Sequence, residues 1–328
     1  MNKGRQGDIT LAIIIPCYNE EAVLPETAKR LQNKINALIA KSLISDKSKI
    51  VFVDDGSQDA SWKLITNYHT ENPHLFSGIK LSKNRGHQNA LLCGLLTMKD
   101  FCDAAVSIDA DLQDDIEIID KMISQYKSGS EIVYGVRSER KKDTVFKRIS
   151  AQCFYSFMKM LGVDIIYNHA DYRLMGKNSL NALSQYREVN LFLRGIIPML
   201  GYKTSFVYYA RAERFAGESK YPLRKMLKFA FEGITSFSIK PIRCITTLGI
   251  IIFTVSLVMI AYSLIQYFGG RTVLGWSSMI CSLWGIGGLI LLGLGITGEY
   301  IGKIYLETKK RPRFTIEEML CEAADAGH

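Results

Sequence analysis

The chain has few of the residues that build disulfide or zinc-binding frameworks. Its seven cysteines are scattered along 328 residues, and no two of them form a Cys-x-x-Cys pair. An odd, unpatterned set of this kind is typical of reduced cysteines in the cytosol. Segment 1–8 is polar and lacks the apolar core of a signal peptide. We therefore expect the bulk of the chain to stay in the cytosol.

Zinc-finger spacing and RNA-binding aromatic motifs are also missing. The net charge is nevertheless +9, and a basic balance suits either nucleic acid or the anionic cytoplasmic face of a membrane. Basic residues flank two long apolar segments, so the membrane is favoured and no nucleic-acid partner is predicted. These flanking residues are Lys240, Arg243, Lys303, Lys309, Lys310, Arg311 and Arg313.

Charge is absent from the two apolar segments near the C-terminus. Residues 244–268 form a run of 25 without a charge, and residues 272–298 a run of 27. Each run can cross a hydrocarbon core of roughly 30 Å. The connector 269–271 is very short, which predicts a two-helix transmembrane hairpin over 244–300. The positive-inside bias places both of its ends in the cytoplasm.

The remaining parts of the chain are predicted around this hairpin. We expect a cytosolic catalytic domain over 1–220 and a basic cytosolic tail over 301–328, with a short helix at 314–320. Segment 221–243 mixes basic and apolar residues, which fits an interfacial helix or an ordinary amphipathic surface helix. Glycines in the second span give it a small-residue surface, and this surface permits a homo-oligomer.

Short apolar runs alternate with helical patterns over residues 9–136. Continuous apolar strands separated by helices indicate an α/β fold whose mainly parallel sheet is covered on both faces. A helix is predicted over 20–39 from its apolar spacing. Strands are predicted at 11–16, 50–53, 79–81, 104–108 and 132–136.

Polar motifs follow three of these strands, at the sheet edge where α/β proteins bind ligands. They occupy 16–20, 54–57 and 109–113. In the third motif Asp109, Asp111 and Gln113 alternate, so they share one face if the segment is extended. Hard oxygen ligands at a strand end suit Mg²⁺ or Mn²⁺ carrying a phosphate-bearing substrate.

Together these motifs resemble those of family 2 glycosyltransferases with the GT-A fold, a Rossmann-like domain. The resemblance covers about residues 9–225, and it is closest to polyprenyl-phosphate glycosyltransferases such as bactoprenol glucosyltransferases and dolichol-phosphate mannose synthases. The matching sequences are PCYNE at 16–20, VDDGS at 53–57, NRG at 84–86, DADLQDD at 109–115 and RFAGESKY at 214–221.

The resemblance implies a nucleotide-sugar site. Tyr18 would stack on the base, and Asp54 or Asp55 would accept a hydrogen bond from the base N–H, with Asp55 preferred. Arg214 and Lys220 would close over the phosphates. The residues implied to bind the nucleotide sugar are Pro16, Tyr18, Glu20, Asp54, Asp55, Asp109, Ala110, Arg214 and Lys220.

The resemblance also implies a metal on the diphosphate. Asp111 and Gln113 would ligate Mg²⁺ or Mn²⁺, and Asp109 would contact either the ribose or the metal shell. Because the leaving group is a nucleoside diphosphate, negative charge grows on phosphate oxygens in the transition state. The metal and nearby cations are needed there, so Asp111 counts among the catalytic residues.

On the acceptor side, Arg137 and Arg148 are implied to meet the acceptor phosphate. Asp171 would orient the acceptor or serve as a weak base, and Arg173 would pair with it or bind phosphate. A purely structural Asp–Arg pair is the alternative. An acceptor phosphate monoester has a second pKa of about 6, so it needs a cationic cradle more than a strong base.

The resulting hypothesis is inverting transfer of one hexose, glucose by resemblance, from a UDP-sugar to undecaprenyl or another polyprenyl phosphate. Such an enzyme would be a multi-pass protein of the bacterial cytoplasmic (inner) membrane. UDP-galactose, UDP-N-acetylglucosamine or GDP-mannose are alternative donors.

Two other classes of protein fit the sequence less well. A processive polysaccharide synthase would carry a Gln-x-x-Arg-Trp motif, which none of Trp62, Trp276 and Trp284 follows. A non-catalytic nucleotide-sugar-binding membrane protein would need a broken site, yet the acidic motif is complete.

Overall fold

A computed structural model of the chain describes residues 8–138, 169–188, 193–210 and 275–321, and some positions between 242 and 268. The chain forms two compact units. The first is built from segments 1–150, 165–221 and 311–328, and the second from 151–164 and 222–310. Each unit is described separately below.

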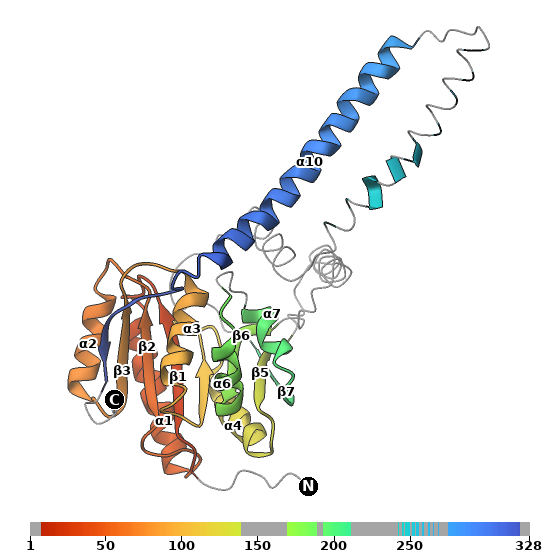
Figure 1. Cartoon of the computed structure of the whole chain (residues 1–328). Helices are drawn as coiled ribbons and strands as arrows, with labels where there is room; N and C mark the ends of the chain where they lie inside the picture. Colours follow the sequence, from red (N-terminus) through yellow and green to blue (C-terminus); the bar gives the residue numbers. More distant parts are fainter. Residues whose placement is uncertain are drawn as a thin grey trace. The chain divides into compact units, whose positions relative to one another are not determined.

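The first unit contains a mixed sheet in the order β7-β5-β6-β4-β1-β2-β3-β8 (Figure 1). The pairs β1–β2, β1–β4, β2–β3 and β5–β7 are parallel, whereas β6 and β8 pair antiparallel with their neighbours. The predicted α/β class with a mainly parallel sheet is confirmed. The strands are β1 (Leu11–Cys17), β2 (Lys49–Asp54), β3 (Phe76–Leu81), β4 (Ala104–Ser107), β5 (Ile132–Arg137), β6 (His169–Gly176), β7 (Thr204–Tyr209) and β8 (Ile316–Leu320).

Helices connect and cover these strands. In α1 the apolar residues recur every three to four positions, and this face is buried on the sheet while the opposite face meets solvent. α3 packs on β1, β2 and β4, whereas α4 packs on β5, β6 and β7. The helices of this unit are α1 (Leu24–Ala40), α2 (Ser61–Glu71), α3 (His87–Met98), the 3₁₀ turn η1 (Ile116–Ile118), α4 (Ile119–Lys127), α6 (Lys177–Gln185) and α7 (Leu193–Met199).

The core lies around the central strands. Every residue of β1 is buried, which is why its sequence is continuously apolar rather than alternating. α3 can approach β1 and β2 closely because it carries Gly94. A Cβ at this position would lie 2.4 Å from Ile14 Cγ2 and 2.8 Å from Val53 Cγ2. The missing side chain therefore sets the distance between the helix and the sheet.

The last strand corrects an expectation from the sequence. The short helix predicted over 314–320 is wrong, because Ile316–Leu320 forms β8 and pairs antiparallel with β3. Trp62 Nε1 donates to Glu318 Oε2 at 3.1 Å, and Lys80 Nζ lies 3.0 Å from Glu317 Oε1. The region expected as a basic tail over 301–328 is thus in part helix and in part an edge strand of the sheet.

The second unit contains α10 (Trp276–Thr308), a helix of 33 residues. Its segment Ile286–Thr308 is long and apolar enough to cross a membrane, and it is the single such helix in the described residues. The residues described between 242 and 268 are helical, and a Cβ at Gly293 would lie 3.3 Å from Ile245 Cγ2. Most of the first predicted span and most of 221–243 lie outside the described residues, so the hairpin and the juxtamembrane helix stay predictions.

Replacing Gly94 by Ala tests the packing of α3. We expect Gly94→Ala to lower the free energy of unfolding by about 1–3 kcal/mol, because the added methyl group overpacks the contact with Ile14 and Val53. Asn36→Ala, on the exposed face of α1, is the matched control and should change little. Thermal unfolding of the purified variants measures both, and an unchanged melting temperature for Gly94→Ala would contradict the close approach.

Candidate active site

The first two polar motifs come together beside the carboxyl ends of β1 and β2. Asp55 is buried and accepts hydrogen bonds from the backbone N–H groups of Arg85 at 2.7 Å and Gly86 at 2.8 Å. Asp54 is also buried and accepts from the Ser57 N–H at 3.1 Å. Burial raises the pKa of both carboxyls, and the hydrogen bonds oppose that rise. Both aspartates therefore hold loops in place.

Gly56 allows these loops to meet. It has a φ of +72°, a conformation that favours glycine, and a Cβ would lie 2.8 Å from the backbone N of Asn84. The turn after β2 thus packs directly on the segment that leads into α3.

The residues predicted after β1 lie close to this turn. Tyr18 exposes 42% of its surface, so its ring is accessible for stacking on a base. Pro16 lies at the end of β1, and the backbone N–H of Glu20 is held by Ser61 Oγ at 2.9 Å.

The acidic motif after β4 is a turn, and the prediction of an extended segment there is wrong. Leu112 has a φ of +57°, and the Gln113 N–H donates to Asp111 Oδ1 at 3.2 Å. This local hydrogen bond stabilises the turn, as aspartate commonly does. Thr27 of α1 fixes the other end, since its hydroxyl donates to the Ala110 carbonyl at 2.9 Å. Asp109 and Gln113 therefore do not share one face through simple alternation.

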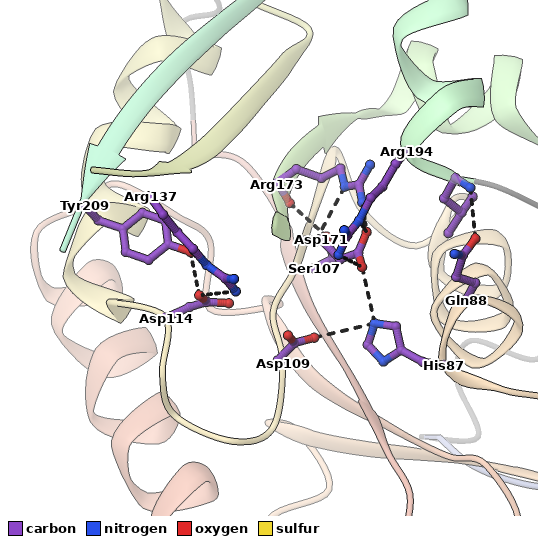
Figure 2. Close-up of polar contacts among 11 residues, drawn as sticks. His87, Gln88, Ser107, Asp109, Asp114, Arg137, Asp171, Arg173, Arg194 and Tyr209 are labelled. Carbon is purple, nitrogen blue, oxygen red and sulfur yellow. Dashed lines mark hydrogen bonds and ion pairs between the residues drawn. The ribbon is translucent and has the colours of Figure 1, made fainter. Parts of the chain in front are cut away.

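Asp114 continues the motif and organises the ends of β5 and β7. Arg137 Nη2 donates to Asp114 Oδ1 at 3.3 Å, and the Tyr209 hydroxyl donates to the same oxygen (Figure 2). Burial would lower the pKa of Arg137, but the Asp114 carboxylate and the Tyr209 hydroxyl together outweigh burial and raise it. Arg137, expected at the acceptor phosphate, is thus a fixed cation at this edge.

The acceptor-side motif is a charge cluster on β6 and α7. The Arg173 guanidinium is fully buried and donates to Asp171 Oδ1. Arg194 donates two hydrogen bonds to the same carboxylate, from Nε to Oδ1 at 3.2 Å and from Nη2 to Oδ2 at 2.9 Å (Figure 2). Burial alone would raise the pKa of Asp171, but Arg194 and Arg173 outweigh it and hold the pKa below its usual range.

His87, the first residue of α3, joins the two halves of the site. Its Nε2 lies 3.5 Å from Asp109 Oδ1 and 3.7 Å from Asp171 Oδ2 (Figure 2). Burial raises the pKa of Asp109 to about 6, and His87 opposes the rise. The sequence alone indicates no role for His87, because only the fold brings the start of α3 close to both Asp109 and Asp171.

The donor set suits a divalent cation that is held mainly through a substrate. Within the described residues no group of three or more His, Cys, Asp or Glu side chains could hold a metal. Asp111 and Gln113 nevertheless offer oxygen atoms beside Asp109, and Mg²⁺ commonly binds one or two carboxylates plus phosphate oxygens and waters. The residues therefore fit a metal that arrives with a diphosphate, and they do not fit a resident all-protein site.

The remaining predicted site residues, Arg148, Arg214 and Lys220, lie outside the described residues. The structure adds Arg194, which was missed. Its signal in the sequence was a single charge inside the apolar run from Leu191 to Leu200. A lone arginine in such a run needs a buried partner or a ligand, although the sequence does not say which.

The family model for Glycosyl transferase family 2 matches residues 12–184, which include β1 to β6 and the acidic motif. The chain belongs to glycosyltransferase family 2. It is therefore a glycosyltransferase, and the resemblance noted from the sequence motifs is confirmed.

Relatives align with nearly the whole chain. A Bacillus subtilis protein named "Uncharacterized glycosyltransferase YkoT" is 52% identical, over 95% of this chain and 93% of its own length. The Escherichia coli "Prophage bactoprenol glucosyl transferase homolog" is 35% identical, over 94% and 99%. The "Bactoprenol glucosyl transferase" of Shigella phage SfX is 36% identical, over 94% and 98%. The similarity thus extends past the family domain into α10.

Neutralising Asp171 should destabilise the fold. Asp171→Asn leaves the buried Arg173 without its carboxylate, and we expect the free energy of unfolding to fall by about 3–5 kcal/mol at neutral pH. Because the pKa of Asp171 is lowered in the folded state, its contribution is present above the unfolded value of about 3.9 and fades as the pH falls below it.

Thermal melts at pH 7 and near pH 3 measure this effect. The difference in melting temperature between wild type and Asp171→Asn should be smaller at the lower pH. Asp100→Asn, at an exposed position, is the control and should show almost no gap at either pH. Equal melting temperatures for wild type and Asp171→Asn at pH 7 would contradict the role of the carboxylate.

Proposed function

We propose that this glycosyltransferase moves a single hexose, glucose in the first instance, from a UDP-sugar to undecaprenyl or another polyprenyl phosphate. The bactoprenol glucosyl transferases that match the whole chain support the lipid acceptor and the sugar. The supporting observation from the geometry is the position of Asp109. Asp109 follows β4, and His87 Nε2 lies 3.5 Å from Asp109 Oδ1 and 3.7 Å from Asp171 Oδ2, so Asp109 lies close to the cluster of Asp171, Arg173 and Arg194. A sugar held at this point has the donor loops on one side and cations on the other.

This arrangement suits an inverting displacement. The acceptor phosphate oxygen attacks C1 of the sugar, the bond from C1 to the diphosphate oxygen breaks, and UDP leaves from the opposite face. The acceptor is largely dianionic at neutral pH, so no strong base is required. Mg²⁺ or Mn²⁺ held by Asp111 and Gln113, with Asp109 nearby, would neutralise the charge that grows on the diphosphate.

Around the donor, we propose that Tyr18 stacks on the base and that Pro16, Glu20 and Ala110 line the pocket. Asp54 or Asp55 meets the base N–H. Arg214 and Lys220 bind the phosphates, and Arg137 and Arg148 meet the acceptor.

The enzyme would work at the cytoplasmic face of a bacterial inner membrane. Segment Ile286–Thr308 of α10 can cross a bilayer, and the acceptor is a lipid. We retain the hairpin over 244–300, the juxtamembrane segment 221–243 and a cytosolic catalytic domain over 1–220 as part of this proposal. A homo-oligomer is compatible with the open glycines of α10, such as Gly288 and Gly295, which have nothing within 4 Å of a built Cβ.

The sugar is open to a direct test. Full-length protein in detergent is incubated with Mg²⁺, undecaprenyl phosphate and one radiolabelled donor at a time: UDP-glucose, UDP-galactose, UDP-N-acetylglucosamine or GDP-mannose. We expect organic-phase label from UDP-glucose. Label from another donor would keep the lipid chemistry and change the sugar. Release of UDP without labelled lipid would refute the acceptor, and neither product would favour a binding protein.

The metal has its own prediction. Asp111→Ala should lower the transfer rate by at least about 100-fold, because the diphosphate charge then lacks its metal ligand. EDTA should abolish transfer by wild type, and Mg²⁺ or Mn²⁺ should restore it. Asp100→Ala is the control and should keep full activity. An unchanged rate of sugar transfer in EDTA would contradict the metal-dependent mechanism.

A further inference from the structure

Arg194, in the first turn of α7, brings a positive charge to the half of the site that contains Asp171. Arg194 is held from two directions. Its guanidinium donates two hydrogen bonds to the Asp171 carboxylate. Its helix is also hydrogen-bonded to α3, because the Leu193 N–H donates to Gln88 Oε1 at 3.1 Å (Figure 2). Two parallel bonds fix the plane of a guanidinium as well as its position. Arg194 is therefore presented in a defined orientation.

Two guanidinium groups share one carboxylate in the cluster around Arg194. Asp171 is the shared partner of two guanidinium groups, those of Arg173 and Arg194. Arg173 is fully buried, and the Asp171 side chain exposes 9% of its surface. The Arg194 side chain exposes 33%. Of the two guanidinium groups, that of Arg194 therefore reaches the surface of the site.

The surroundings of this charge are those of the acceptor. Arg137 at the end of β5 is close enough to act electrostatically on Arg194, as is Asp109 after β4. In the sheet, β5 and β6 lie on one side of β4, whereas β1, β2 and β3 with the donor motifs lie on the other. Two arginines, each anchored on a buried aspartate, therefore flank the side of Asp109 that faces away from the donor loops.

We propose that Arg194 binds the phosphate of the polyprenyl phosphate acceptor, and that Asp171 is a positioning residue that holds the Arg194 guanidinium. This inference rests on the proposed function and adds to it a residue that no sequence motif indicated. A phosphate monoester dianion next to Arg194 and Arg137 would meet two charge-assisted donors.

The arrangement also argues against Asp171 as the base. Both of its carboxylate oxygens accept hydrogen bonds from Arg194, and Oδ1 accepts a further one from Arg173. A carboxylate occupied in this way is poorly placed to take a proton from an acceptor. The dianionic acceptor needs no proton transfer to a base, so the contribution of Asp171 is to orient the Arg194 guanidinium.

Steady-state kinetics on the full-length protein in detergent test the proposal. We expect Arg194→Gln to raise KM for undecaprenyl phosphate by roughly 10- to 100-fold, the effect of losing a charged hydrogen bond. KM for the sugar nucleotide should change less than about twofold. The acceptor KM of Arg194→Lys should lie between those of wild type and Arg194→Gln, because lysine keeps the positive charge but lacks the paired N–H donors of a guanidinium. Arg187→Gln, an exposed arginine just after α6, is the matched control.

A direct binding measurement separates this proposal from the proposed function. Calorimetry with dodecyl phosphate, and with UDP in a second experiment, needs no turnover. Dodecyl phosphate should bind Arg194→Gln more weakly than wild type by a similar factor, and UDP should bind both equally. If wild type transfers no sugar but Arg194→Gln still loses dodecyl phosphate, the proposed function fails and the phosphate site stands.

Other outcomes overturn the proposal. A rise in KM for the sugar nucleotide, or weaker UDP binding, would assign Arg194 to the donor diphosphate. Unchanged acceptor KM and unchanged dodecyl phosphate binding would leave it a structural residue. Asp171→Asn, where it folds, should mimic Arg194→Lys in acceptor KM. A fall in kcat at saturating acceptor, with KM unchanged, would restore Asp171 as a base.

Discussion

Buried carboxylates at the carboxyl ends of the strands hold the candidate site together. A carboxylate removed from water costs several kcal/mol unless hydrogen bonds and cations replace its solvation. The buried aspartates of this site meet that need in part by binding a loop or a neighbouring arginine. Asp55 holds the backbone before α3, and Asp54 holds the turn after β2. Asp114 and Asp171 each hold arginines.

The same interactions divide the site into two halves with different chemistry. Where aspartate is satisfied by backbone N–H groups, the loops are fixed and no extra cation is brought in, which suits a nucleoside between Tyr18 and the turn at Gly56. Where aspartate is satisfied by guanidinium groups, positive charge accumulates, which suits phosphate. Asp109 and His87 lie at the boundary between the two halves. If the proposed function holds, the choice of partner for each buried carboxylate separates the half for the nucleoside from the half for the acceptor phosphate.

Much of the first half could be predicted from the sequence, because its determinants are local. Continuous apolar runs gave β1, β2 and β4 to within a residue or two at each end, and the polar residues that follow them marked the strand ends. The acidic motif was located correctly. Its conformation was not, because the turn at Leu112 depends on contacts that alternation does not report, including the hydroxyl of Thr27 that lies far away in the sequence.

The second half depends on residues that only the fold brings together, and there the sequence was less informative. Arg194 meets Asp171 from α7, and His87 meets it from the start of α3. β8 illustrates the same limit: its five residues are too few for a clear periodic pattern, and pairing with β3 decides their conformation.

β8 also bears on how the loops at this end of the sheet are held in place. It follows α10 after a short connection, and the Ser82 N–H beyond β3 donates to the Thr315 carbonyl at 3.0 Å. Ser82 leads directly into the segment that Asp55 holds. The strand therefore closes an edge of the sheet that would otherwise expose unpaired backbone groups next to the donor loops. A chain that continued in another direction after α10 would leave that edge open, so the segment after α10 contributes to the stability of the loops that Asp55 holds.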